Sequence, residues 1–209
     1  MDVRLDDLKA RDRYALMTSF VVPRAIAWVS TKDRAGRTNL APFSYFTGLG
    51  SDPAMITLGI ALRADGSEKD TLRIAKATGC LCVNLVEEAH LSAMHQSSFE
   101  YGADESEIDA LALETRPCAS IDGVRLASAR AALECTLVDA HLYGRKGKVA
   151  LVVAEIVHAF IDDAILDASA RAEGRPVIDP DRIAPVARLG GEHYALLGER
   201  LRRPRPTGR

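Results

Sequence analysis

The chain has 209 residues, of which 47% are hydrophobic, and a formal net charge of -2 at pH 7. This apolar content is enough for one buried core, so we expect one domain over residues 1–198 and a basic, disordered tail over 199–209. The balanced charge leaves no broad basic face, which argues against a nucleic-acid partner. No apolar run approaches the roughly 20 residues that span a bilayer, and the N-terminal segment is charged. We therefore expect a cytoplasmic protein that does not enter a membrane.

The four cysteines, Cys80, Cys82, Cys118 and Cys135, are too few for a disulfide framework in a chain of this length. No C-x-x-C pair marks a zinc site, and we expect no metal. Cys80 and Cys82 alternate along a predicted strand and so share a face. We interpret the four thiols as buried and reduced.

Mixed helical and irregular character marks residues 5–17, and a first strand is predicted at 18–22. Residues 23–46, PRAIAWVSTKDRAGRTNLAPFSYF, then predict a β-hairpin whose charged turn contains Gly36. Pro42 cannot donate a hydrogen bond to a neighbouring strand, so the second arm must lie at a sheet edge or contain a bulge. A bulge beside these polar side chains would leave backbone groups available for a ligand.

A helix is predicted to begin near Ser67 and Asp70, which resemble a capping box, and to end at Gly79. The start of a helix offers unpaired N–H groups and a positive dipole, both of which suit a phosphate. Lys69 and Thr71 add a cation and a hydroxyl at this end. The alternative is an ordinary solvated helix start.

The remaining segments predict a β-rich chain. Strands are expected at 54–61, 80–86, 130–142 and 148–161, a loop at 48–53, helical character at 87–94, an acidic loop with a short helix at 96–112, and a shaped loop without regular elements at 178–194. About six strands at short spacing with few helices favour a closed barrel.

Four motifs occur in order along the chain: PRAIAWVST (23–31), NLAPFSYF (39–46), GSEKDT (66–71) and ARLGGEHY (187–194). Together they resemble the flavin reductase-like, FMN-binding split-barrel family, which includes flavoredoxin. The resemblance covers residues 14–198 approximately. It implies a mainly β fold, a six-stranded antiparallel Greek-key split barrel with flanking helices, and a homodimer with FMN near the subunit interface.

The resemblance also implies the residues that contact the cofactor. The isoalloxazine ring and ribityl chain would lie against Trp28, Val29, Ser30, Thr31, Asn39, Leu40, Ala41 and Ser44. The phosphate would be held by Arg63, Ser67, Lys69 and Thr71, which favours a phosphate site over the solvated helix start. The candidate substrate contacts are His158, Arg188, His193 and Tyr194. A core position remains the alternative for Trp28 and Tyr194, and a half-buried, paired histidine is the alternative for His158.

The expected function is NAD(P)H-dependent reduction of bound FMN, with electrons or reduced flavin passed to an acceptor such as a partner protein. The flavin performs this chemistry, so we expect no catalytic side chain. Two alternatives stay open: a carrier that stores FMN without turning over NADH or NADPH, and a split barrel that binds another planar phosphorylated ligand. The segment before Pro53, Thr47-Gly48-Leu49-Gly50, departs from the family pattern and puts substrate choice in question.

Overall fold

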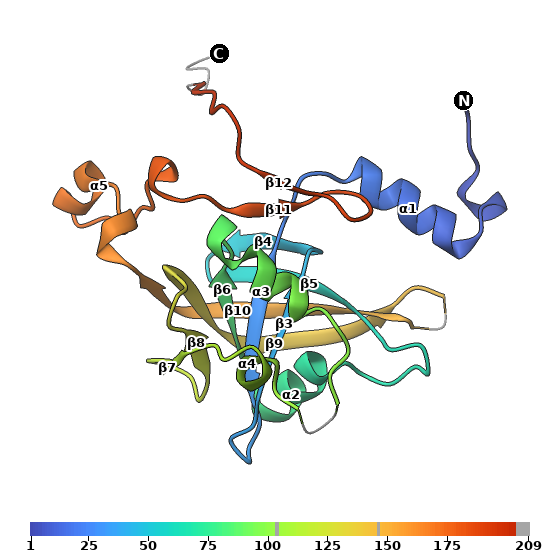
Figure 1. Cartoon of the computed structure of the whole chain (residues 1–209), viewed down its shortest axis with the longest axis horizontal. Helices are drawn as coiled ribbons and strands as arrows, with labels where there is room; N and C mark the ends of the chain where they lie inside the picture. Colours follow the sequence, from blue (N-terminus) through green and yellow to red (C-terminus); the bar gives the residue numbers. More distant parts are fainter. Residues whose placement is uncertain (103–104, 146, 204–209) are drawn as a thin grey trace.

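The computed structural model describes residues 1–102, 105–145 and 147–203 (Figure 1). Its strands are β1 (Arg24–Ala25), β2 (Ala27–Lys32), β3 (Thr38–Phe43), β4 (Phe46–Ser51), β5 (Ala54–Ala61), β6 (Cys80–Leu85), β7 (Thr115–Pro117), β8 (Val124–Leu126), β9 (Ala131–Tyr143), β10 (Val149–Ile161), β11 (Val186–Arg188) and β12 (Tyr194–Leu196). Its α-helices are α1 (Ala10–Phe20), α2 (Asp70–Thr78), α3 (Leu91–Gln96), α4 (Glu107–Ala110) and α5 (Ala168–Ala172). Short 3-10 helices cover Leu5–Asp7, Glu88–His90, Asp163–Ile165 and Pro180–Arg182.

Within the described residues, the main sheet has seven antiparallel strands in the order β3-β2-β6-β9-β10-β5-β4. Strand β3, at one edge, contacts β5 near the other edge, so the sheet curls into a barrel. The predicted mainly β, antiparallel fold with flanking helices is confirmed. The predicted count of six strands is wrong, because the segment before Pro53 forms β4 rather than a loop. Gly48 and Gly50 flank a register shift on this edge strand.

The predicted hairpin is confirmed as β2 and β3, with Trp28 opposite Pro42 and Thr31 opposite Asn39. Strand β3 lies at the edge of the sheet, as Pro42 requires. The backbone N–H of Leu40 points away from β2 and donates to Glu107 at 2.9 Å. Pro42 is two residues further and faces the same edge, so its missing N–H leaves no donor unpaired.

The predicted strand at 18–22 is wrong. Thr18 lies in α1, where its hydroxyl donates to the carbonyl of Tyr14 and so is satisfied within the helix.

The predicted capping box at the start of α2 is also wrong. The Ser67 hydroxyl donates to Asp65, and α2 begins at Asp70 with Lys69 in the N-cap position. The predicted helix end at Gly79 is confirmed, with φ of 78°.

The prediction of an irregular segment from 178 to 194 is also wrong. Strands β11 and β12 form a short hairpin, and β11 pairs with β1. Strands of three residues carry too little periodicity to be recognised in sequence, and only the pairing with β1 makes them regular. The predicted strands at 54–61, 80–86, 130–142 and 148–161 and the short helix in the acidic loop are confirmed as β5, β6, β9, β10 and α4.

Two apolar clusters form the core of the part of the chain that the structure describes. Val29, Leu58 and Leu81 lie in the first cluster, inside the barrel, while Trp28 and Leu40 lie in the second, on the outer face under α3 and β8. Strand β2 is therefore buried on both faces, which explains its nearly continuous run of buried residues.

A buried arginine attaches α1 and the C-terminal hairpin to the barrel. Arg24 is 7% exposed, and its guanidinium donates to the carbonyl oxygens of Thr18, Val21 and Leu189 at 2.6 to 2.9 Å. These bonds hold the end of α1 beside β11, and both lie on the same side of the barrel in Figure 1. Charge-assisted bonds to carbonyl groups are among the stronger hydrogen bonds in proteins, so this contact fixes that side of the molecule.

No helix within the described part of the chain is long and apolar enough to cross a membrane. Three predicted segments extend beyond the described residues: the acidic loop at Ala103 and Asp104, the turn between β9 and β10 at Lys146, and the basic tail from Pro204 onward.

Candidate functional site

A groove follows the outer edge of β3 and consists of two adjacent cavities. The first, of about 180 Å³, lies between β3, the start of α2 and the loop after α3. The second, of about 270 Å³, lies between the end of β3, α3 and the β11–β12 hairpin. Both cavities are lined by Pro42 and Ser98. The edge strand thus presents a continuous polar and apolar surface from the start of α2 to the C-terminal hairpin.

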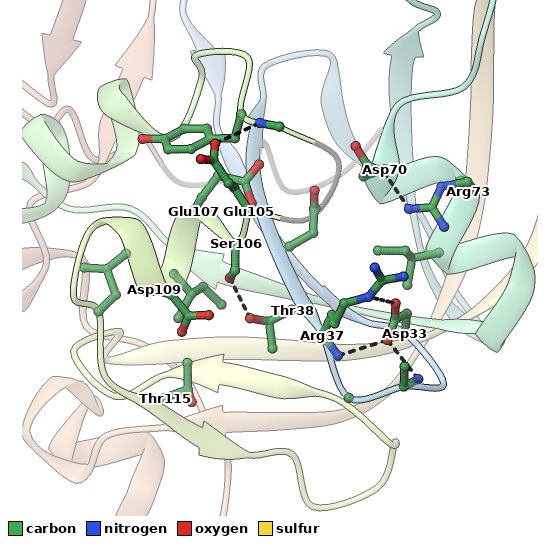
Figure 2. Close-up of a pocket in the computed structure, with 18 residues that line it drawn as sticks. Asp33, Arg37, Thr38, Asp70, Arg73, Glu105, Ser106, Glu107, Asp109 and Thr115 are labelled. Atoms are coloured by element: carbon green, nitrogen blue, oxygen red, sulfur yellow. Dashed lines mark hydrogen bonds and ion pairs between the residues drawn. The ribbon is translucent and has the colours of Figure 1, made fainter.

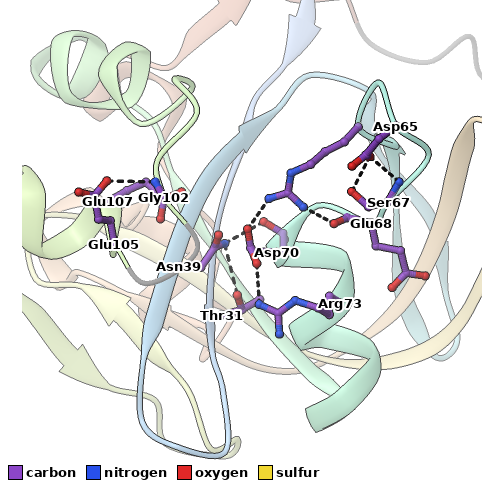
Figure 3. Close-up of polar contacts among 12 residues, drawn as sticks. Thr31, Asn39, Asp65, Ser67, Glu68, Asp70, Arg73, Gly102, Glu105 and Glu107 are labelled. Atoms are coloured by element: carbon purple, nitrogen blue, oxygen red, sulfur yellow. Dashed lines mark hydrogen bonds and ion pairs between the residues drawn. The ribbon is translucent and has the colours of Figure 1, made fainter.

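A buried hydrogen bond joins the hairpin to the helix start at the first cavity. The side-chain amide of Asn39 donates to the hydroxyl of Thr71 at 2.8 Å. It also donates, more weakly, to the hydroxyl of Thr31 at 3.4 Å (Figure 3). Thr71 is 1% exposed, yet it lines the cavity. Because a hydroxyl both accepts and donates, Thr71 retains its own hydrogen for a second partner.

Of the three cationic side chains that the structure describes around the start of α2, two are paired and the third is not. Arg63 donates to the carbonyl of Glu68 and to the carboxylate of Asp70, which also accepts from Arg73. Burial alone would raise the pKa of Asp70, but the hydrogen bonds from Arg73 and Arg63 hold it below the ordinary value. Lys69 lines the same cavity, and its side-chain ammonium group makes no hydrogen bond or ion pair with any described residue. It is therefore the cation that this helix start leaves available.

A buried carboxylate forms the wall behind the edge strand. Glu107, on α4, is 8% exposed and accepts the hydrogen bond from Leu40. Burial raises its pKa, although the hydrogen bond from Leu40 opposes this effect. Glu107 also faces a third cavity of about 430 Å³, shown in Figure 2, where Arg37 pairs with Asp33 and Arg73 with Asp70. This third cavity is strongly polar, and among the described residues its five carboxylates outnumber its two arginines.

The second cavity of the groove contains aromatic and cationic groups. The Arg188 guanidinium lies 4.5 Å from the centre of the Tyr194 ring, and the Tyr194 hydroxyl lies 3.2 Å from Nδ1 of His95. Ser44 accepts from Arg24 at 3.4 Å, which ties this end of β3 to α1. This end of the groove therefore offers flat side chains beside hydrogen-bonding groups, whereas the other end offers an ammonium group and a helix start.

The protein-family model described as "Flavin reductase like domain" matches residues 17–176 of the chain. The chain belongs to the flavin reductase-like family. The resemblance inferred from the four motifs is confirmed.

Relatives of this flavin reductase-like chain extend over nearly its whole length. An uncharacterized protein of Halalkalibacterium halodurans is 32% identical over 99% of this chain and 97% of its own. Nitrilotriacetate monooxygenase component B from Bacillus cereus is 27% identical, with a TM-score of 0.89 over 97% of this chain and 98% of that one. A protein from Shewanella frigidimarina described as a flavin reductase with a split barrel domain is 25% identical, with a TM-score of 0.82 over 97% and 96%. The split-barrel architecture of this flavin reductase-like chain is thereby supported.

The structure of this flavin reductase-like chain brings eight of the predicted site residues to the groove. The first cavity is lined by Asn39, Ala41, Arg63, Lys69 and Thr71. The second cavity is lined by Ser44, Arg188 and Tyr194. These residues come from β3, the start of α2 and the C-terminal hairpin, which are far apart in sequence.

Other predicted contacts lie in the interior. Trp28, Val29, Ser30, Thr31 and Leu40 are each at most 1% exposed. The Trp28 indole donates to Ser97, and the Ser30 hydroxyl donates to the carbonyl of Val124. The polar groups of these side chains already have partners within the protein, so they are not available to a ligand. These side chains therefore support the groove from behind.

Three predicted residues lie away from the groove. Ser67 is exposed and bonds to Asp65. His193 sits in the β11–β12 turn beside the carbonyl of Gly190. His158 is half-buried on β10, with Nδ1 3.2 Å from the buried carboxylate of Glu134. A direct role for these three in ligand contact stays a prediction that their positions do not favour.

Several groove residues were not anticipated from the sequence. The first cavity is also lined by Ser97, Ser98, Phe99 and Tyr101, and the second by Tyr14 and His95. The run of serines directly after a predicted helix is the only local signal, since such residues often end a helix. Their contact with β3 is a tertiary feature that no local pattern predicts.

Glu107→Gln should increase the free energy of unfolding at neutral pH. The raised pKa means that ionisation of Glu107 costs stability in the folded protein, whereas the amide oxygen of glutamine still accepts from Leu40. The difference in the free energy of unfolding between the variant and wild type should reach its full size above the folded-state pKa of Glu107. It should vanish as pH falls toward 4.5, the ordinary pKa of glutamate. Urea unfolding across this range measures it, with the exposed Glu114→Gln as control. A difference that is constant across this pH range would contradict the role of ionisation.

Proposed function

We propose that this chain is an FMN-binding oxidoreductase that uses NADH or NADPH to reduce flavin and passes electrons or reduced flavin to an acceptor. The observation that carries the proposal is the groove along β3, which has an available cation at one end and aromatic and hydrogen-bonding groups at the other. FMN has a matching arrangement of groups, with a phosphate at one end and a planar ring at the other. Family membership supports a flavin as the ligand.

The start of α2 fits the phosphate. Lys69 has no competing partner among the described residues, Thr71 retains a hydroxyl hydrogen, and the first N–H groups of α2 have no partner within the helix. Arg63 contributes indirectly, because its bonds to Glu68 and Asp70 fix the turn that leads into the helix. Ser67 is left out of the proposed contacts.

The other end of the groove fits the ring and its substrate. Bound FMN would supply the ring that accepts a hydride from nicotinamide. Ser44 and Arg188 would offer hydrogen bonds beside that ring, and the guanidinium would offset negative charge that develops there. Tyr194 would present a flat surface on the same side, held by its contact with His95. The side chains of Asn39 and Ala41, which line the first cavity, complete the proposed contacts along β3.

The acceptor is proposed to be a partner protein in the cytoplasm. The solved structure with a TM-score of 0.89 is described as component B of nitrilotriacetate monooxygenase, a name that designates one component of an enzyme. That relationship supports transfer of reduced flavin or electrons out of this chain. The domain boundary after Gly198 stays a prediction.

We also propose a homodimer. Helix α1 exposes apolar side chains, including Phe20 at 84% exposure and Met17 at 46%. An open cavity beside it is lined by Leu16, Val22 and Leu189. Tyr14 of the same helix lines the groove, so a second copy that covers α1 would lie next to the ligand.

Sedimentation equilibrium of the purified chain should give twice the chain mass of 22.6 kDa. Phe20→Glu should shift the distribution toward the single chain, because it places a charge in the proposed interface. The exposed Arg11→Glu on the same helix serves as the control. A wild-type protein that stays at the single-chain mass at every concentration would overturn the dimer.

Lys69→Met should weaken binding of FMN by about 10- to 100-fold and leave riboflavin binding nearly unchanged, because a charge-assisted hydrogen bond to phosphate contributes about 1.5–3 kcal/mol. Fluorescence titration of both flavins measures the two dissociation constants. Lys9→Met removes the same charge from the exposed start of α1 and should change neither constant. Equal loss for both flavins would place the phosphate elsewhere.

The reductase and carrier functions differ in one measurement. Under anaerobic conditions, NADH or NADPH should bleach the visible absorbance of the FMN-loaded protein. If neither nucleotide bleaches a flavin that remains bound, the chain is a carrier. If FMN does not bind at all, the FMN-binding proposal is overturned, and another planar phosphorylated ligand is the alternative to test.

A further inference from the structure

Two cysteines meet on the side of the sheet where the β7–β8 hairpin packs. Glu134, which is 1% exposed, accepts hydrogen bonds from the backbone N–H groups of Ala119 and Ser120 at 2.8 and 2.7 Å. Glu134 is also the direct cross-strand partner of Cys82. Because directly opposed residues share a face of the sheet, these bonds bring Cys118, the residue before Ala119, over Cys82.

The two thiols differ in exposure and in charge state. Cys118 is half-buried, whereas Cys82 is 1% exposed. Hydrogen bonding between the thiols lowers the pKa of Cys118 and raises that of Cys82. Burial and the Glu134 carboxylate raise the pKa of Cys118, but the nearby cations Arg125 and Lys32 oppose this effect. The more accessible sulfur is thus the one that more readily forms a thiolate.

The other two cysteines lack this arrangement. The Cys80 thiol is directed to the carbonyl of Asp122 at 3.7 Å. Cys135 is fully buried in the core cluster inside the barrel, on the opposite face of β9 from Glu134, and burial raises its pKa to about 12. A reactive thiolate beside a second thiol is the arrangement in which oxidation leads to a disulfide.

We propose that Cys118 is a site of oxidation by hydrogen peroxide and that Cys82 completes the reaction by forming a disulfide with it. The site is separate from the groove along β3, and neither residue lines a cavity of that groove. The disulfide would attach the β7–β8 hairpin covalently to β6, which the hydrogen bond from the backbone N–H of Leu126 to the side-chain oxygen of Asn84 already joins to that hairpin.

The reaction balances with peroxide as the only oxidant. The Cys118 thiolate attacks one peroxide oxygen, so an S–O bond forms, the O–O bond breaks and the second oxygen leaves as water after taking a proton. The Cys82 sulfur then attacks the Cys118 sulfur, so the S–S bond forms and the S–O bond breaks, and the hydroxyl leaves with the Cys82 proton as water. Two thiols are oxidised, one peroxide is reduced to two waters, and an external dithiol reverses the change by exchange.

The test treats the full-length, flavin-free protein with a small excess of hydrogen peroxide, followed by thiol counting and peptide mass mapping. Accessible thiols in the denatured protein should fall from four to two, and the Cys82 and Cys118 peptides should be linked. Dithiothreitol should restore all four. Cys135→Ser, which removes a neighbouring cysteine outside the pair, should give the same linked peptide.

Cys82→Ser should stop the reaction at a Cys118 sulfenic acid, which a dimedone probe would label, and Cys118→Ser should leave Cys82 reduced. A linked pair that includes Cys80 or Cys135, or four free thiols after treatment that fully oxidises a low-pKa thiol standard, would overturn the proposal. The mapping uses the wild-type chain, so its result does not depend on whether a variant folds or on whether flavin binds.

Discussion

The hydrogen bond from Asn39 to Thr71 is the contact on which the proposed site depends. It joins the edge of the hairpin to the first turn of α2, two segments that are separated by two further strands in the chain. The bond is buried, so losing it would leave an unpaired amide in the interior, which typically costs about 1–3 kcal/mol. This penalty keeps the helix start against β3. Without it, the cation of Lys69 and the edge of β3 would not face the same cavity.

The distribution of charge around this bond follows from which groups already have partners. Arg63 and Arg73 both form ion pairs with Asp70, and these ion pairs stabilise the start of α2. Lys69 extends from the N-cap position, where the helix dipole and the unpaired N–H groups already favour an anion. Three favourable features therefore coincide at one end of the groove. At the opposite end, Arg24 holds Ser44, α1 and β11 together, so the same edge strand is fixed at both ends.

Local patterns predicted the parts of the fold that local chemistry determines. The β2–β3 hairpin follows from its apolar arms and Gly36, whose φ of 86° suits a turn, and α2 ends where Gly79 adopts a left-handed conformation. Strands β4, β11 and β12 were missed because glycines or short length hide their periodicity, and only pairing stabilises them. For the site, the sequence identified the helix start and the edge strand. It did not identify which polar groups would form hydrogen bonds inside the protein. The Ser30 hydroxyl, for example, donates to the carbonyl of Val124 and accepts from the side chain of Asn84 in the interior. Partner choice of this kind is decided by tertiary packing.

The most direct test of this account is a crystal structure of the chain with FMN bound. In that structure the phosphate should lie within hydrogen-bonding distance of Lys69 and Thr71, with the ring at the far end of the groove beside Ser44 and Arg188. A flavin whose phosphate lies away from the start of α2, or which occupies the cavity between Asp33 and Asp109 instead, would contradict it.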